Sequence, residues 1–97
     1  MMKIEINTTG ETLSLSLEGR LDTTTAPELE GAISNNLGGA ASIVIDCKNL
    51  TYVSSAGLRV LLSTHKKMKG EMKLTKVNEL VMEVLEMTGF ADIWVIA

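Results

Sequence analysis

The sequence predicts an α/β domain: a mixed β-sheet of four or five strands with three to four helices packed mainly on one side. Segments that alternate like strands and segments spaced like helices follow one another in the order β-β-α-β-α-β-α-β. A run of β-branched residues without alternation predicts a central parallel strand in which Ile43, Val44 and Ile45 are all fully buried. At 97 residues and 45% hydrophobic content, the chain is expected to form one domain over residues 1–97.

The first two strands are expected to form a hairpin. Residues 3–7 alternate between apolar and polar, and residues 8–11 have the composition of a turn. Leucines then alternate with polar residues over 13–18, which predicts a half-buried strand that ends at Gly19.

A first helix is expected to follow this hairpin. Thr25 and Glu28 have the spacing of a capping box, and Pro27 is tolerated in the first turn of a helix. Apolar residues recur at helical spacing up to residue 37, and the pair Gly38-Gly39 is expected to end the helix.

The second half of the chain repeats the pattern of strand and helix. A buried strand is expected over 42–47, a helix from Ser54-Ser55 to Gly70, and a further strand over 72–77. The apolar stripe of this helix includes the histidine, and the three alternate side chains that share one face of the last strand are Met72, Leu74 and Lys76.

The chain is expected to close with a third helix and a short strand. Asn78 is a favoured N-cap, and Gly89 fits the left-handed position after the helix, with Phe90 packing back on its last turn. The terminal strand is expected over 93–96. The apolar stripe of the helix is predicted to contain Leu80, Val81, Val84 and Leu85.

Composition excludes several classes of function. Nine Lys and Arg against twelve Asp and Glu leave a net charge of −3, which favours neither a nucleic-acid binder nor an acidic disordered tail. One cysteine and one histidine cannot form an internal disulfide or a Cys/His zinc site. The apolar runs are far shorter than the roughly 20 residues that span a bilayer. We therefore expect a cytoplasmic domain without cofactor or metal, and without direct contact to nucleic acid or membrane.

Two surface features have alternative interpretations. Residues 58–76 contain six Lys or Arg against one Glu. This basic stretch is either a solvated helix face and strand edge or a patch for an acidic partner. The methionines on the helices either fill the aliphatic core or line an adaptable surface for a partner.

The sequence lacks a convincing catalytic constellation. Ser55 and His65 are ten residues apart on one predicted helix, roughly 15 Å at about 1.5 Å per residue, so the histidine cannot activate the serine. His65 and Cys47 are both interpreted as packed side chains. Asp22 and Asp46 each follow a predicted strand and are expected together at one end of the sheet, but two carboxylates do not specify a metal. A small hydrolase is therefore disfavoured.

The most informative stretch is residues 50–61, where two serines precede small residues and an apolar helical run. One serine can cap the helix by accepting a backbone N–H, and a cap needs only one. Ala56 and Gly57 are interpreted as leaving the helix start open to another protein, since glycine in a first turn costs stability relative to alanine.

Three motifs that together extend over nearly the whole chain resemble one family. They are Gly-Arg-Leu-Asp-Thr at 19–23, the stretch from Ile-Asp at 45–46 to Ser-Ser-Ala-Gly-Leu at 54–58, and the C-terminal helix with its Thr-Gly-Phe ending at 88–90. These motifs are similar to the Gly-x-Leu-Asp, the Asp…Leu…Asp/Ser-Ser-x-Gly-Leu and the terminal helix of the STAS domain. The name stands for sulfate transporters and anti-sigma-factor antagonists, and the small bacterial stand-alone antagonists match best.

The resemblance implies a STAS-like fold and a binding module that is not an enzyme. Such antagonists bind an ATP-dependent anti-sigma-factor serine kinase and so release a sigma factor. Phosphorylation of a serine at the start of the second main helix ends the binding, and a serine phosphatase is a possible further partner.

Carried over residue by residue, the phosphate acceptor is Ser55, with Ser54 as second choice. Two positions depart from the pattern: Ser54 stands where many antagonists have Asp, and Ala56 stands where some carry a hydroxyl. The implied partner-binding residues are Asp22, Thr23, Asp46, Ser54, Ser55, Ala56, Gly57 and Arg59.

The resemblance leaves one rival open. In a STAS scaffold or adaptor of another bacterial signalling or lipid-transport complex, Ser55 would be only a helix cap, without a phosphorylation switch.

Overall fold

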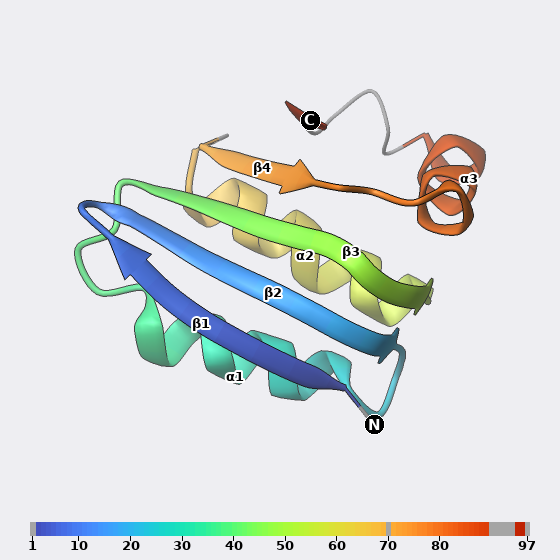
Figure 1. Cartoon of the computed structure of the whole chain (residues 1–97), viewed down its shortest axis with the longest axis horizontal. Helices are drawn as coiled ribbons and strands as arrows, with labels where there is room; N and C mark the ends of the chain where they lie inside the picture. Colours follow the sequence, from blue (N-terminus) through green and yellow to red (C-terminus); the bar gives the residue numbers. More distant parts are fainter. Residues whose placement is uncertain (1, 70, 90–94, 97) are drawn as a thin grey trace.

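The computed structural model describes residues 2–69, 71–89 and 95–96 (Figure 1). The elements follow one another in the predicted order, so the α/β prediction is confirmed. They are β1 (Lys3–Thr9), β2 (Thr12–Leu21), α1 (Ala26–Asn36), β3 (Ser42–Val53), α2 (Ser55–Lys67), β4 (Met72–Thr75), α3 (Glu79–Thr88) and β5 (Val95–Ile96).

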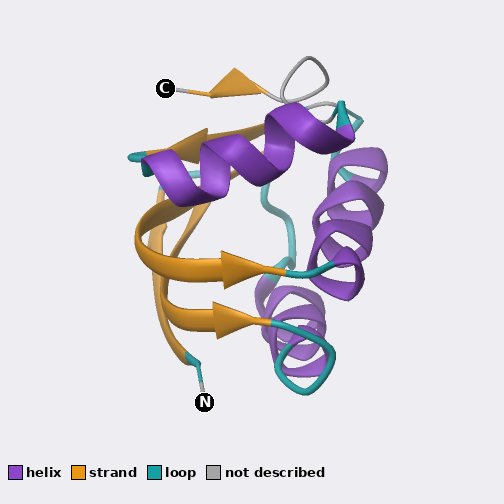
Figure 2. Ribbon diagram, turned by 90° about the vertical axis from the view of Figure 1, so that its right-hand side faces the viewer, coloured by secondary structure: helices purple, strands orange, loops and turns teal. Residues whose placement is uncertain are grey.

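The strands form one mixed sheet in the order β1-β2-β3-β4-β5. β1 runs antiparallel to β2, and the other neighbouring pairs are parallel. Helices α1 and α2 lie on one face of the sheet, and no helix of the described residues covers the opposite face (Figure 2). Helix α3 lies beyond the carboxyl end of β4 (Figure 1). The helices are therefore mainly on one side, as predicted.

The uncovered face of the sheet explains one wrong prediction. In β3, Ile43 and Ile45 are 1% and 0% exposed, but Val44 between them is only half-buried. Successive side chains of a strand point to opposite faces, so Val44 points away from the helices. Its β-branched side chain suits a strand without requiring full burial.

The N-terminal hairpin agrees with the sequence. Thr9 pairs with Thr12, and the two-residue turn between them has Gly10 at φ 60°. Glycine at this first turn position suits a type II′ turn, the kind that matches the twist of the strands. The alternate leucines of β2 are buried and form one side of the core, as predicted. They are Leu13, Leu15 and Leu17.

The carboxyl ends of β2 and β3 carry two irregularities that the sequence did not indicate. Their register shifts between residues 16 and 18 and again between 19 and 20 of β2. Such β-bulges place an extra residue on one strand and increase its twist. At the second shift, Thr51 Oγ1 donates to the carbonyl of Gly19 over 2.9 Å, and Gly19 has φ 105°. Gly19 therefore lies within β2, and its prediction as the strand end was wrong.

Strand β4 is shorter than predicted. β4 stops at Thr75 because Lys76 has φ 54°, outside the extended region, so Lys76 does not share a strand face with Met72 and Leu74. Asn78 caps α3 and Gly89 ends it at φ 80°, both as predicted. Leu80 is 63% exposed and does not belong to the buried stripe.

The second helix was expected to end at Gly70 but already ends at Lys67, with Met68 as its C-cap. Two predictions concern residues outside the described part of the chain: the packing of Phe90 and the first half of the terminal strand at 93–94. Among the described helices, none is long and apolar enough to cross a membrane.

Candidate functional site

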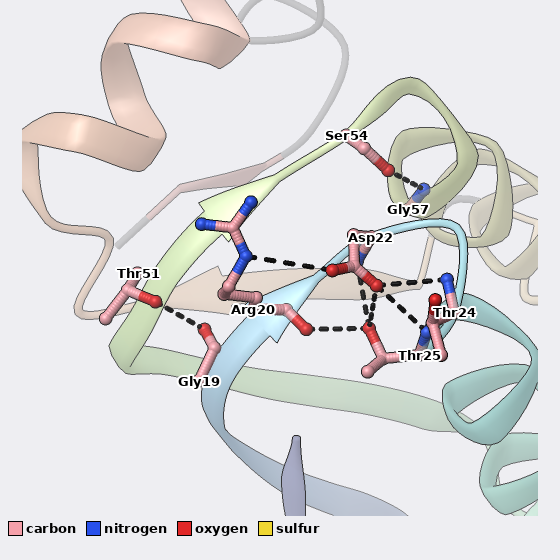
Figure 3. A network of polar contacts seen from close by, with 8 residues as sticks. All are labelled: Gly19, Arg20, Asp22, Thr24, Thr25, Thr51, Ser54 and Gly57. Atoms are coloured by element: carbon pink, nitrogen blue, oxygen red, sulfur yellow. Dashed lines mark hydrogen bonds and ion pairs between the residues drawn. The ribbon is translucent and has the colours of Figure 1, made fainter. Parts of the chain in front are cut away.

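The site is built where the ends of β2 and β3 meet (Figure 3). Leu21 pairs with Val53, and the carbonyl of Leu21 accepts a hydrogen bond from the backbone N–H of Ser54 over 2.8 Å. The loop that begins at Asp22 and the turn that begins α2 therefore leave the sheet side by side. The structure brings Asp22 together with Ser54 and Ser55.

Asp46 does not join this group, and its expected place at the same sheet end was wrong. The strand that was predicted to stop at residue 47 continues to Val53, so Asp46 lies in the middle of β3. Ser54 comes eight positions later, roughly 25 Å along an extended strand. Asp46 instead pairs with Lys76 over 3.6 Å, beyond the end of the shorter β4.

The loop before α1 is held by Asp22 and Thr25 rather than by a capping box. Asp22 Oδ1 accepts hydrogen bonds from the N–H groups of Thr24 and Thr25, at 3.0 and 3.1 Å. Thr25 is buried, and its hydroxyl accepts from the N–H of Asp22 and donates to the carbonyl of Arg20. Thr25 makes no side-chain cap bond, so the predicted capping box with Glu28 was wrong.

These bonds also fix the charge of Asp22. Hydrogen bonds to the ionised form favour it, so the pKa of the Asp22 carboxyl lies below its ordinary value of 3.8. The N–H of Thr25 is the largest cause, and the Arg20 guanidinium adds a smaller lowering. A fixed negative charge therefore lies next to the start of α2.

At the start of α2, the two serines have different roles. Ser54 is the N-cap with an extended backbone, and its Oγ accepts from the N–H of Gly57 over 3.4 Å, a long hydrogen bond. Ser55 is the first residue of the helix. Its side chain is exposed, and its hydroxyl bonds to no other described residue.

Gly57 serves packing inside the molecule. A Cβ at this position would lie 2.5 Å from Leu21 Cγ and 3.1 Å from the Leu21 carbonyl. Since Leu21 is 0% exposed, its side chain has no free space to move into. The interpretation of Gly57 as a surface left open to another protein was wrong: it is buried, and only Ala56 beside it stays partly accessible.

The exposed residues at the paired ends of β2 and β3 include two that sequence reasoning missed. The guanidinium of Arg20 lies 4.2 Å from the ring centroid of Tyr52, and its Nε lies 3.7 Å from Asp22 Oδ2. The sequence does not indicate this pairing, because it depends on the bulges, which bring residue 20 opposite residue 52. Thr23 and Arg59, both proposed from the sequence, are exposed as well.

The remaining reactive groups lie away from Ser55 or are packed. His65 is half-buried further along α2, as expected. Burial raises the pKa of the Cys47 thiol to about 12, with a smaller contribution from the Asp46 charge. Within residues 2–69, 71–89 and 95–96 there is no cluster of His, Cys, Asp and Glu suited to a metal. The described surroundings of Ser55 thus offer an accessible hydroxyl without a base to activate it.

The basic stretch is exposed at the other end of α2. Lysines 66 and 67 belong to the last turn of the helix, Lys69 follows it, and Lys73 lies in β4. Of the helix methionines, Met68 is buried while Met87 is 81% exposed, so both interpretations of these residues apply.

Comparison with known proteins identifies the family. The STAS domain model matches residues 3–97. The chain is 33% identical to the putative anti-sigma factor antagonist BtrV of Bordetella bronchiseptica, over 99% of this chain and 86% of that protein. It is 25% identical to the anti-sigma-B factor antagonist of Bacillus subtilis, over 95% and 87% of the two chains.

Solved structures show the same fold. An anti-sigma factor antagonist from Mycobacterium paratuberculosis superposes with a TM-score of 0.88 at 22% identity, over 99% of this chain and 85% of that one. The antagonist SpoIIAA in its unphosphorylated form gives a TM-score of 0.83 at 19% identity, over 98% and 88%. The chain therefore belongs to the STAS domain family, among the anti-sigma-factor antagonists, which are regulators and not enzymes.

Proposed function

We propose that this protein is a phosphorylatable anti-sigma-factor antagonist. It binds an anti-sigma factor that is also an ATP-dependent serine kinase, and this binding releases a sigma factor. Phosphorylation of Ser55 by the kinase ends the complex, and a serine phosphatase restores the antagonist. The observation that carries the proposal is the exposed hydroxyl of Ser55, which the fold leaves unused at the start of α2.

The difference between the two serines supports Ser55 as the acceptor. Ser54 is half-buried, its N–H is bonded to Leu21 and its Oγ faces the N–H of Gly57. A phosphate on Ser54 would have to displace this cap. Ser55 can enter a kinase active site without breaking a contact to the described residues, so Ser54 remains the second choice.

The physical chemistry of the site favours a switch in binding rather than in folding. A phosphate adds about −1.5 to −2 charges at pH 7 and three acceptor oxygens. The free N–H groups and the dipole at the start of a helix favour a negative charge, so α2 tolerates the group. On a partner surface the same group adds bulk and charge and must be desolvated. The neighbouring Asp22 carboxylate adds to the negative potential there.

The proposed partner surface is smaller than the set of residues that the resemblance implies. It keeps those of the implied residues that are exposed or partly exposed where the two strand ends meet. Gly57 contributes by packing, and Asp46 lies elsewhere on the sheet. The surface consists of Asp22, Thr23, Ser54, Ser55, Ala56 and Arg59.

Phosphosite mapping tests the proposal. A pull-down from native lysate identifies the kinase, which is then incubated with ATP and the parent protein, S55A or S54A. Tandem mass spectrometry should find phosphate on Ser55 of the parent and of S54A. S55A should bind the kinase but stay unmodified. Phosphate only on Ser54, or on no residue with a verified active kinase, would contradict the assignment, and the latter result would favour a scaffold.

A further inference from the structure

Arg20 is held by two weak contacts at the edge of the candidate site. Its side chain is 58% exposed, its guanidinium covers one face of Tyr52 at 4.2 Å, and its Nε approaches Asp22 Oδ2 only to 3.7 Å. That separation exceeds a hydrogen bond. In Figure 3 the two terminal nitrogens of Arg20 point away from Asp22. No hydrogen bond or ion pair to the described residues engages them.

The register places this arginine next to the start of α2. Arg20 pairs with Tyr52, and the next pair, Leu21 with Val53, leads directly to Ser54. Figure 3 shows Arg20 and Ser54 on adjoining strand ends. The backbone of Arg20 therefore lies one residue pair before Ser54, and its side chain carries two free donor nitrogens of a permanent cation.

We propose that Arg20 is the intramolecular partner of the phosphate on Ser55, and that it leaves the ring of Tyr52 to bind the phosphate. This inference rests on the proposed function, since it concerns the phosphorylated state. The terminal nitrogens donate to the phosphate oxygens, while Nε stays beside Asp22 and so separates two negative groups.

The exchange is favourable because the contacts that Arg20 gives up are weaker than those it would make with the phosphate. An exposed cation–π contact and a long ion pair are weak. A guanidinium and a phosphate form charge-assisted hydrogen bonds that are often bidentate. The exchange also uncovers the ring of Tyr52, so phosphorylation changes both the charge and the apolar surface that a partner meets.

Arg59 is the competing cation. It lies four positions after Ser55 on α2, and side chains at this spacing share a helix face and lean toward the N-terminus. Arg59 is exposed and has no aromatic partner among the described residues. Binding by Arg59 would therefore leave the contact between Arg20 and Tyr52 intact, and this difference separates the two arrangements.

The test uses the full chain with phosphoserine incorporated at position 55 during translation, so that it needs no kinase. Phosphorus NMR gives the second pKa of the phosphate in the parent, R20Q and R59Q backgrounds. Phosphoserine at position 34, an exposed residue of α1, is the reference. Tyr52 is the single tyrosine, so its ring signals report the contact with Arg20 directly.

We expect the second pKa of the phosphate at position 55 to rise by about 0.5–1 unit in R20Q, because the doubly charged phosphate loses the stabilisation by a nearby arginine. The Tyr52 ring signals should shift on phosphorylation in the parent and R59Q, and stay constant in R20Q. A phosphate pKa at position 55 that is the same in R20Q as in the parent, ring signals of Tyr52 that do not shift on phosphorylation of the parent, or an effect of R59Q alone would overturn the inference. If the incorporated phosphate engages Arg20 but no kinase modifies Ser55, the inference stands and the proposed function fails.

Discussion

Helices α2 and α3 both follow parallel strands, yet their first turns are held in different ways. At the start of α3, Asn78 Oδ1 accepts from the N–H of Val81 over 3.0 Å. The Nδ2 of the same side chain donates to the carbonyl of Leu50 over 2.6 Å. One residue thus caps the helix and ties it to β3, and its polar groups are fully used.

The start of α2 has a weaker cap and a spare hydroxyl. Ser54 Oγ lies 3.4 Å from the N–H of Gly57, and the hydroxyl of Ser55 bonds to no other described side chain or backbone group. Close packing of Gly57 on Leu21 holds this turn instead. Where packing holds the backbone, a hydroxyl can be modified at little cost to the fold. Of the two helix starts, that of α2 is therefore the one suited to a switch.

The largest effect is expected where packing holds α2. Gly57→Ala should destabilise the fold by about 2–3 kcal/mol, because the new Cβ meets a fully buried leucine that cannot move away. Gly31→Ala is the matched control: it lies within α1 with no atom within 4 Å of the added Cβ. It should stabilise by about 0.5–1 kcal/mol. Urea unfolding measures both, and equal effects would refute the packing argument.

The cap of α3 comes next. Asn78→Ala should cost about 1–2 kcal/mol, because it removes the cap and leaves the Leu50 carbonyl without its donor. Asn78→Asp keeps an oxygen for the N–H of Val81 but loses that donor, so it should retain part of the stability. If Asn78→Ala lowers the free energy of unfolding by no more than Ser54→Ala does in the same urea titration, the two helix starts do not differ as described.

The Asp22 loop predicts a pH dependence. Because the pKa of Asp22 is lowered in the folded state, its carboxylate contributes stability above the ordinary value of 3.8. This contribution is lost as the pH falls through the lowered pKa. Asp22→Asn should therefore melt below the parent at pH 7, and the gap should close in strong acid. A gap that is constant from pH 7 to pH 2 would show that ionisation is not the cause.

The smallest effects are expected at the two serines. Ser54→Ala should cost about 0.5–1 kcal/mol through the lost cap. Ser55→Ala should stay within about 0.5 kcal/mol of the parent, as an exposed residue without partners does. Urea unfolding of both variants distinguishes them. If Ser55→Ala lowers the free energy of unfolding by more than Ser54→Ala does, Ser55 is the structural residue.

Local patterns predicted much of this molecule. The alternation of the hairpin, the N-cap Asn78 and the left-handed Gly89 all act within a few residues of the chain. The resemblance led to the serine pair at the start of α2, and its phosphorylation stays a prediction.

Two of the errors have a common physical cause: they depend on contacts between distant segments. Strand β3 continues past residue 47 to Val53, paired with β2 across two bulges, and this keeps Asp46 away from the site. The same bulges bring Arg20 beside Tyr52. The bonds between Asp22 and Thr25 replaced a capping box whose spacing was correct, because burial of Thr25 turned its hydroxyl toward β2.

The central claim is that a phosphate on Ser55 changes binding and leaves the fold intact. Isothermal titration of the anti-sigma partner into the unmodified protein and into protein with phosphoserine at position 55 tests it most directly. Thermal unfolding of the same two samples is the control. We predict at least about tenfold weaker binding, which corresponds to about 1.4 kcal/mol, and melting temperatures within a few degrees of each other. Equal affinities, or a loss of binding that follows from a loss of folding, would contradict the claim.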